Sequence, residues 1–190
     1  MRALLTLGLL VALSLPTMGQ SGVRSGYTPQ TSSDRWHKYL EETVASKRAY
    51  LRAAGGALID QATNTPSEWH RTLAGYGKRY PSNFGTFTIE DTIHELGAAA
   101  FDYDSRYLHC QCTGMWPRSR YAITSGVLSY KADGRRHLDL TKAAAAYGSG
   151  MLTVAWYPHR YSAFDTGVRF GHTQFAFVFG GNLLDEFTPD

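Results

Sequence analysis

Two cysteines and a histidine stand within four residues, in the run His109-Cys110-Gln111-Cys112. Two thiolates and an imidazole are ligands for a soft ion such as Cu(I) or Zn(II), but a structural zinc site needs a fourth ligand and none is evident in the sequence. In an exported protein, two cysteines usually oxidise. We therefore predict a disulfide between Cys110 and Cys112, with no resident metal or cofactor. A soft-metal or redox role of His109, Cys110 and Cys112 is the alternative.

A second group of side chains suited to chemistry surrounds His94. The pair His94-Glu95 resembles the start of a zinc-protease helix, which carries a second histidine four residues after the first. Here that position is Ala98, so the zinc motif is broken. Glu95, Asp102 and Asp104 still supply carboxylates close to His94 in the sequence, and such pairs perform general acid–base catalysis. A periplasmic hydrolase using these residues is one hypothesis, and a solvated helix face followed by a turn is the alternative.

Other signatures of catalysis and of nucleic-acid binding are missing from the sequence. There is no phosphate-binding loop and no dinucleotide fingerprint, and Ser125-Gly126 lacks the preceding glycine of a nucleophile elbow. The formal net charge is only +3 and no cluster of Lys and Arg stands out, which argues against nucleic acid as a partner. The basic pairs Lys78-Arg79, Arg118 with Arg120, and Arg135-Arg136 suit a solvated surface or phospholipid head groups.

Helical periodicity dominates the rest of the chain and predicts a compact all-α bundle of five to six helices. The first helix begins at Ser33 or Asp34, which are good N-caps, and carries an apolar stripe broken only by Lys47. The second begins at Thr65-Pro66 and ends at Pro81. The apolar members of the stripe are Trp36, Leu40, Val44, Leu51, Ala54 and Leu58. Later helices are expected over residues 84–101, 116–131, 140–157 and 165–187, with a loop over residues 102–114.

Glycine and alanine are concentrated in these predicted helices, which predicts Gly/Ala-lined packing between them. Gly55-Gly56 weakens the first helix by about 1 kcal/mol per glycine relative to alanine, so either the helix bends there or another helix packs close. Three pairs have the small-xxx-small spacing that lets helix backbones approach closely. They are Ala144 with Gly148, Ala146 with Gly150, and Gly167 with Gly171.

Two segments also fit β-strands. Phe175, Phe177 and Phe179 alternate as strand residues do, and residues 121–140 could form a hairpin around the turn at Asp133-Gly134. These patterns leave a small outer-membrane β-barrel as the alternative fold. The capped helix starts and the long apolar stripe favour the helical bundle.

The first nineteen residues have the pattern of a secretory signal peptide. Arg2 is followed by an apolar run over residues 3–15 and then by small residues. The run is about thirteen residues long, short of the ~20 needed to span a bilayer. The alternative is that this segment is not cleaved and remains as a marginal membrane anchor. The predicted organisation is a signal peptide over residues 1–19, a flexible leader over residues 20–32, and a single helical domain over residues 33–190.

Composition indicates a folded domain rather than a disordered chain. Hydrophobic residues make up 43% of the sequence, charged residues 18% and aromatic residues 13%. Charged residues usually make up about a quarter of a globular chain. The low charge indicates either a large core or a surface that meets something apolar, and tyrosine and tryptophan suit such interfaces.

Short motifs are spread over residues 65–190. They are Trp69, Gly75-Tyr76-Gly77-Lys78-Arg79-Tyr80, Asp104-Ser105-Arg106-Tyr107, Ala155-Trp156-Tyr157-Pro158 and Asn182-Leu183-Leu184-Asp185-Glu186-Phe187-Thr188-Pro189-Asp190. In these WYP and EFxPD-like motifs the chain resembles a family of exported bacterial proteins of the acidobacterial type. The resemblance implies export and brings no activity, fold or catalytic residue with it. The Cys110 and Cys112 pair lies outside the shared pattern, which weakens a family-wide metal role.

The sequence therefore favours an exported protein of the cell envelope, located in the periplasm or associated with the outer membrane. It is expected to act by binding or packing rather than by catalysis, with membrane lipid or another envelope protein as its partner. No catalytic residue is assigned. Hydrolysis at His94 and a metal or redox role of Cys110 and Cys112 are the alternative functions.

Overall fold

The protein folds as a bundle of α-helices. The computed structural model describes residues 23–188, so the expected signal peptide over residues 1–19 lies outside the described residues. The structure is 67% helical, with six α-helices and one two-stranded sheet among the described residues. This confirms the predicted all-α bundle. Phe175, Phe177 and Phe179, whose alternation suggested a strand, lie in the last helix, α7 (Ala163–Phe187).

The first predicted helix is divided into two. Helix α2 (Ser32–Leu40) begins with a capping box formed by Thr31 and Asp34, and a π-helical turn follows over Glu41–Ala45. The extended backbone of Ser46 then interrupts the helix, and its hydroxyl accepts the amide of Ala49 to start α3 (Lys47–Thr63). A serine side chain can hydrogen-bond to the backbone and start a new helix instead of continuing the preceding one. Ser46 does so here.

The long helix α4 (Leu73–Ala100) differs most from the prediction. The predicted start at Thr65-Pro66 is wrong, because that segment holds a cis peptide bond and a single 3-10 turn over Ser67–Trp69. The predicted end at Pro81 is also wrong, because the helix runs through it. Proline in a helix interior costs about 3 kcal/mol, and here packing against helices on both sides of α4 outweighs that cost.

A β-hairpin occupies part of residues 121–140, for which the sequence left both a helix and a hairpin open. Helix α5 (Met115–Thr124) is shorter than predicted, and strands β1 (Leu128–Tyr130) and β2 (Arg136–Leu138) pair antiparallel after it. The turn between them contains Asp133-Gly134, as predicted, and Gly134 adopts a φ of +69° that favours glycine. Asp139 then caps α6 (Leu140–Thr153).

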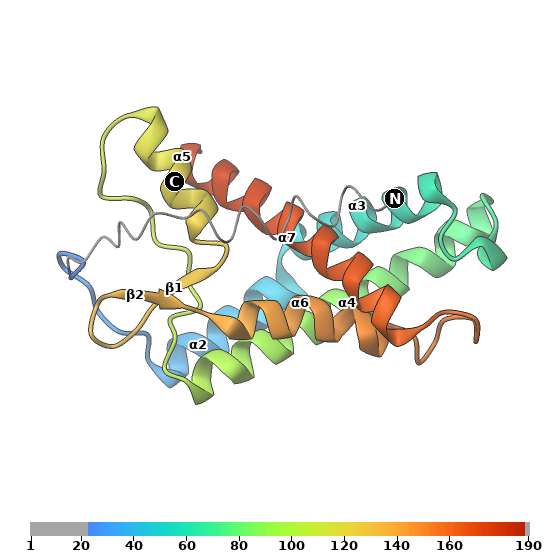
Figure 1. Ribbon diagram of the computed structural model, residues 1–190, viewed down its shortest axis with the longest axis horizontal. Helices are drawn as coiled ribbons and strands as arrows, with labels where there is room; N and C mark the ends of the chain where they lie inside the picture. Colours follow the sequence, from blue (N-terminus) through green and yellow to red (C-terminus); the bar gives the residue numbers. More distant parts are fainter. Residues whose placement is uncertain (1–22, 189–190) are drawn as a thin grey trace.

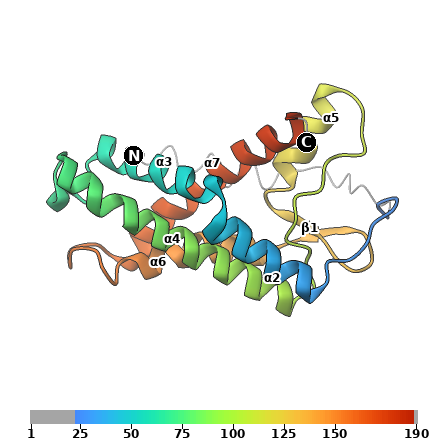
Figure 2. The ribbon, with the colours of Figure 1, turned by 180° about the vertical axis from the view of Figure 1, so that it is seen from behind.

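The helices are arranged around α4, with α6 along one side of it and α3 along the other (Figures 1 and 2). Helix α7 packs chiefly against α6 and, near its C-terminus, against α5. The hairpin lies at the same end of the molecule as α5, and the connections α3–α4 and α6–α7 lie together at the opposite end (Figure 1).

Part of the predicted leader contacts the hairpin. The backbone amide of Arg24 donates to the carbonyl of Gly134 at 3.0 Å. The ring of Tyr27 stacks on Tyr130 with centroids 5.4 Å apart. Residues 23–31 are therefore part of the folded surface, while residues 20–22 lie outside the described residues.

Small residues allow the helices to pack closely, as predicted. A side chain at Gly150 would meet Gly167 and Phe170 of α7, and one at Gly171 would meet the ring of Tyr147. Gly56 lies against α4 in the same way, so close packing rather than a bend accounts for the Gly55-Gly56 pair.

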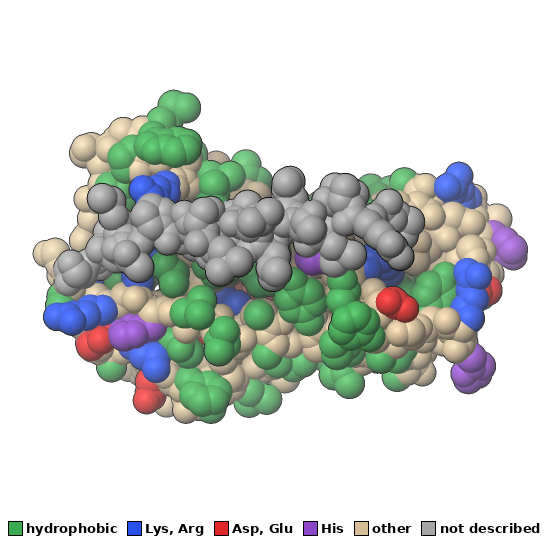
Figure 3. Space-filling view, in the orientation of Figure 1, with side chains coloured by type: hydrophobic (Ala, Val, Ile, Leu, Met, Phe, Trp, Pro, Cys, Tyr) green, Lys and Arg blue, Asp and Glu red, His purple; other side chains and the backbone are tan. Residues whose placement is uncertain are grey.

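The interior is polar and the exterior carries many apolar side chains. Among the described residues, buried polar or charged residues outnumber buried apolar ones, and the largest fully buried side chains are Arg79, Gln174 and Glu186. Helix α3 buries Ala53, Gly56, Ala57 and Asp60, whereas the apolar side chains of the predicted stripe point outward. On the face in Figure 3, apolar side chains gather below the grey residues, and most of the charged side chains lie toward the two ends.

Candidate functional site

A cleft of about 800 Å³ is the main candidate site. Its walls come from α3, α4, the loop after α4, the hairpin, α6 and the C-terminal half of α7. Volumes of about 300–1,000 Å³ are typical of small-molecule sites. A smaller hollow of about 300 Å³ shares Arg52, Asp91 and His94 with it.

Ion pairs between α3, α4 and α7 occupy one part of the cleft. The guanidinium of Arg52 lies 2.5 Å from Glu90 Oε2 and 3.1 Å from Asp91 Oδ1. Its guanidinium carbon also lies 4.3 Å from the ring centroid of Phe87. Arg48 pairs with Asp185 at 2.8 Å. Glu90 and Asp91 therefore share one guanidinium, whereas Asp185 has Arg48 as its partner.

Glu90 is the most perturbed of these carboxyls. Burial raises the pKa of Glu90 to about 7, although the nearby positive charge of Arg52 opposes the shift. The amide nitrogen of the fully buried Gln174 donates to Glu90 Oε2, and the amide oxygen of Gln174 has no partner within the described part of the chain. A protonated Glu90 can donate a hydrogen bond, and an ionised one cannot.

His94 pairs with a carboxylate that the sequence analysis did not consider. Its Nε2 lies 3.5 Å from Oδ2 of Asp139, the residue that caps α6. Asp139 also accepts hydrogen bonds from Ser129 and Thr141. Burial alone raises the pKa of Asp139, but the nearby His94 and the hydrogen bonds from Thr141 and Ser129 outweigh burial and hold it well below its usual value.

The three carboxylates proposed for His94 have other partners or positions. Glu95 Oε1 accepts the hydroxyl of Ser105 at 2.7 Å. Asp104 accepts from Arg106, at 2.6 Å to its Oδ2, and from Tyr27. Asp102 is exposed at the end of α4, with a φ of +57°. Glu95 lines the small hollow together with His94, and the other two carboxylates line neither cavity.

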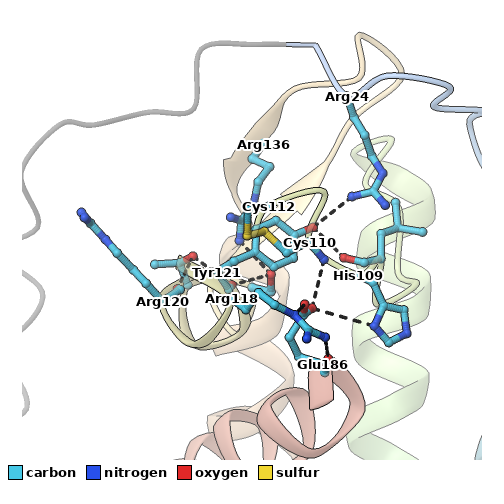
Figure 4. The surroundings of a disulfide bond; sticks show 12 residues. Arg24, His109, Cys110, Cys112, Arg118, Arg120, Tyr121, Arg136 and Glu186 are labelled. Carbon is cyan, nitrogen blue, oxygen red and sulfur yellow. Dashed lines mark hydrogen bonds and ion pairs between the residues drawn. A yellow bond between two sulfur atoms is a disulfide. The ribbon is translucent and has the colours of Figure 1, made fainter. Parts of the chain in front are cut away.

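The loop with the cysteines is attached to the end of α7. A disulfide joins Cys110 to Cys112, so these thiolates are not available as metal ligands. Buried Glu186 accepts from the amide of Cys110 at 3.0 Å, from Arg118 Nε at 2.8 Å and from Tyr107 at 2.8 Å, and His109 Nδ1 lies 3.9 Å away (Figure 4). No group of three or more His, Cys, Asp or Glu residues suited to a metal ion occurs in residues 23–188.

The opposite part of the cleft is positively charged. Arg136 Nη2 donates to Ser125 Oγ at 2.8 Å, and Lys142 Nζ donates to the carbonyls of Ser125 at 2.6 Å and Leu128 at 3.2 Å. Burial lowers the pKa of Lys142 to about 8, and burial also lowers the pKa of Arg136. Figure 4 shows Arg24 and Arg136 on the hairpin side of the cysteine loop.

Sequence reasoning missed Asp139, Lys142, Gln174 and Glu186 as residues of interest. Asp139 had a usable signal, because an aspartate directly before a predicted helix is a favoured cap. The other three have ordinary positions within helices, and only the packing of distant segments gives them their surroundings. Comparisons with protein-family models, with curated proteins and with solved structures give no match to this chain.

Proposed function

We propose that this is an exported protein of the cell envelope that binds to the surface of a lipid bilayer. The observation that carries the proposal is the exposed apolar stripe of α2 and α3. Trp36 of α2 is 58% exposed. Leu51 and Leu58, which are seven residues apart on one face of α3, are 71% and 59% exposed. Exposed apolar side chains that share helix faces are typical of interaction sites.

A bilayer surface suits this stripe because lipid removes apolar side chains from water without requiring a complementary protein surface. An amphipathic helix at a bilayer surface places its apolar side chains among the acyl chains, and in α3 the opposite face packs on α4. Full burial of a large apolar side chain contributes about 1.5–3 kcal/mol. No helix within residues 23–188 has both the length and the apolar composition needed to cross a bilayer.

Sedimentation with lipid vesicles tests this proposal. The purified chain without residues 1–19 is expected to sediment with vesicles of phosphatidylethanolamine and phosphatidylglycerol. Combined substitution of Trp36→Ser, Leu40→Ser and Leu58→Ser is expected to weaken vesicle binding at least ten-fold, because these exposed side chains of the stripe lie outside the cleft and supply the buried area.

A matched variant controls for the loss of exposed apolar side chains in general. Leu138, Leu140 and Leu152 are similarly exposed but lie outside the stripe, and their replacement by serine is expected to leave vesicle binding within two-fold. The proposal is wrong if the original chain stays in the supernatant, or if the two triple variants bind vesicles equally.

The pair of His94 and Asp139 supports a second candidate function, hydrolysis of an ester in the cleft. His94 takes a proton from the attacking water and returns it to the departing alcohol, while Asp139 stabilises the imidazolium. General bases contribute about 10²–10⁴-fold. His94→Gln is therefore expected to lower kcat/KM for a p-nitrophenyl acyl ester at least 100-fold, while the exposed His37→Gln leaves it unchanged. Equal rates for the original chain and His94→Gln would exclude this function.

A further inference from the structure

The charges that line the cleft do not balance. Each carboxylate on its wall has a cation within ion-pair distance. These pairs are Glu42 with Lys38, Glu90 and Asp91 with Arg52, and Asp185 with Arg48. Arg136 and Lys142 also line the cleft, and no carboxylate of residues 23–188 forms an ion pair with either. Both cations therefore lack an ion-pair partner among the described residues, and the charge of Asp139 acts on Lys142 only from beyond ion-pair distance.

These two cations lie close together at the C-terminus of α5. Both bind Ser125, one at its hydroxyl and the other at its carbonyl. Asp139 is close to Lys142 in the sequence, but its oxygens are held by Ser129, Thr141 and His94. Partly buried cations that repel each other are costly unless an anion joins them. The geometry therefore provides a place for a negatively charged group that the chain does not supply.

The remaining wall of the cleft is largely apolar. Phe175, Phe177, Val178 and Leu184 contribute from α7, and Leu51 contributes from α3. Gly180 and Gly181 also line this wall, and a side chain added at either glycine would enter open space. An elongated ligand with a charged head and an apolar body therefore matches the two parts of the cleft.

We propose that the cleft binds an amphiphile with one acidic head group and an acyl chain, with the head between Arg136 and Lys142 and the chain along α7. Both fatty acids and lysophospholipids have this chemistry. The proposal does not depend on binding to a bilayer surface, because such a cleft can also take its ligand from solution.

Calorimetric titration below the critical micelle concentration tests the proposal with three probes. Oleate carries a carboxylate head, oleoyl lysophosphatidylglycerol a phosphate head, and monoolein no charge. At least one of the two anions is expected to bind with one site per chain and at least ten-fold more tightly than monoolein. The tighter of the two anions identifies the head group.

Two sets of variants test the two parts of the cleft. Arg136→Gln with Lys142→Gln keeps hydrogen-bond donors, removes both charges and is expected to abolish the preference for the anion over monoolein. Gly181→Leu fills the apolar part and is expected to weaken every probe at least ten-fold. Gly77→Leu is its matched control, because Gly77 is also helical with open space beside it but lies outside the cleft.

The outcomes distinguish this proposal from the one for the bilayer surface. The proposal for the cleft is overturned if neither anion binds more tightly than monoolein, or if neither anion shows saturable binding. It is also overturned if Gly181→Leu leaves the binding of the probes unchanged. If the double variant does not fold, the comparison between Gly181→Leu and Gly77→Leu still tests whether the probes bind in the cleft. Failure to sediment with vesicles bears only on the exposed stripe, since none of the cleft probes forms a bilayer below its critical concentration.

Discussion

Replacing Arg79 by alanine is expected to destabilise the protein by about 3–5 kcal/mol, the largest single effect that we anticipate. The side chain is fully buried in α4. Its guanidinium donates to the carbonyls of Thr65 at 2.9 Å, His70 at 2.6 Å and Pro66 at 2.7 Å. Alanine would take this donor from all three carbonyls, of which Pro66 O also accepts from the amide of Trp69.

The reason for so large an effect is that Arg79 holds together a connection with little regular structure. The segment between α3 and α4 makes one 3-10 turn, in which Pro66 O accepts from the amide of Trp69 and Ser67 O from the amide of His70. Its remaining hydrogen bonds to α4 depend on the Arg79 side chain. An unsatisfied buried carbonyl costs about 1–3 kcal/mol. Lysine keeps the charge but lacks the planar fork of donors, so Arg79→Lys is expected to recover only part of the loss.

Urea unfolding followed by circular dichroism measures this effect. The neighbouring Lys78 is exposed, and Lys78→Ala is expected to change the unfolding free energy by no more than about 0.5 kcal/mol. Similar midpoints for Arg79→Ala and Lys78→Ala would contradict the assigned role.

The helical class could be predicted from the sequence because it depends on local signals. Helical spacing and composition placed α6 and α7 with an error of a few residues, and Asp133-Gly134 marked the hairpin turn. Spacings of small residues also predicted close helix packing. Each of these signals lies within a few residues of the structure that it produces.

The wrong predictions concern features that depend on contacts between segments far apart in the sequence. Pro81 is a helix breaker by itself, but α3 and α6 pack along the helix that contains it. The apolar stripe of α3 predicted the existence of a helix but not which side is buried, because α4 accepts the small side chains of the other face.

The same limit applies to the candidate site. Asp139 lies 45 residues after His94 in the sequence, and only the packing of α6 on α4 brings the two side chains together. The cations of the cleft come from β2 and α6, whereas the apolar wall comes largely from α7. The spacing of residues within one helix or strand cannot show which distant segments meet. The sequence analysis therefore paired His94 with carboxylates close to it in the chain, namely Glu95, Asp102 and Asp104.

The second large effect is a dependence of stability on pH that is caused by Glu90. Unfolding free energy is expected to fall by about 3 kcal/mol as the pH rises from about 4.5 to above 7. The pKa of this carboxyl is about 7 in the folded protein, against an ordinary value of 4.5. In that interval the folded state binds more protons than the unfolded state, so each rise in pH favours unfolding.

Glu90→Gln isolates this contribution. The amide oxygen of glutamine can still accept from Arg52, and its NH₂ group can donate to the amide oxygen of Gln174, which has no partner in the described structure. Above pH 7 the variant is therefore expected to be more stable than the original chain, because it avoids burying a charge that Arg52 compensates only in part. Near pH 4.5 the advantage disappears, because Glu90 itself is then neutral.

The decisive quantity is the difference in unfolding free energy between Glu90→Gln and the original chain, measured by urea unfolding at several pH values between 4.5 and 8. Contributions of other titrating groups, including Asp139 with its lowered pKa, cancel in this difference. The exposed Glu41→Gln provides the control and is expected to give a difference near zero at every pH. A difference for Glu90→Gln that is equally flat would mean that the pKa of Glu90 is not raised in the folded protein. The pair with Arg52 would then offset burial, and at neutral pH the cleft would hold one more negative charge than we infer.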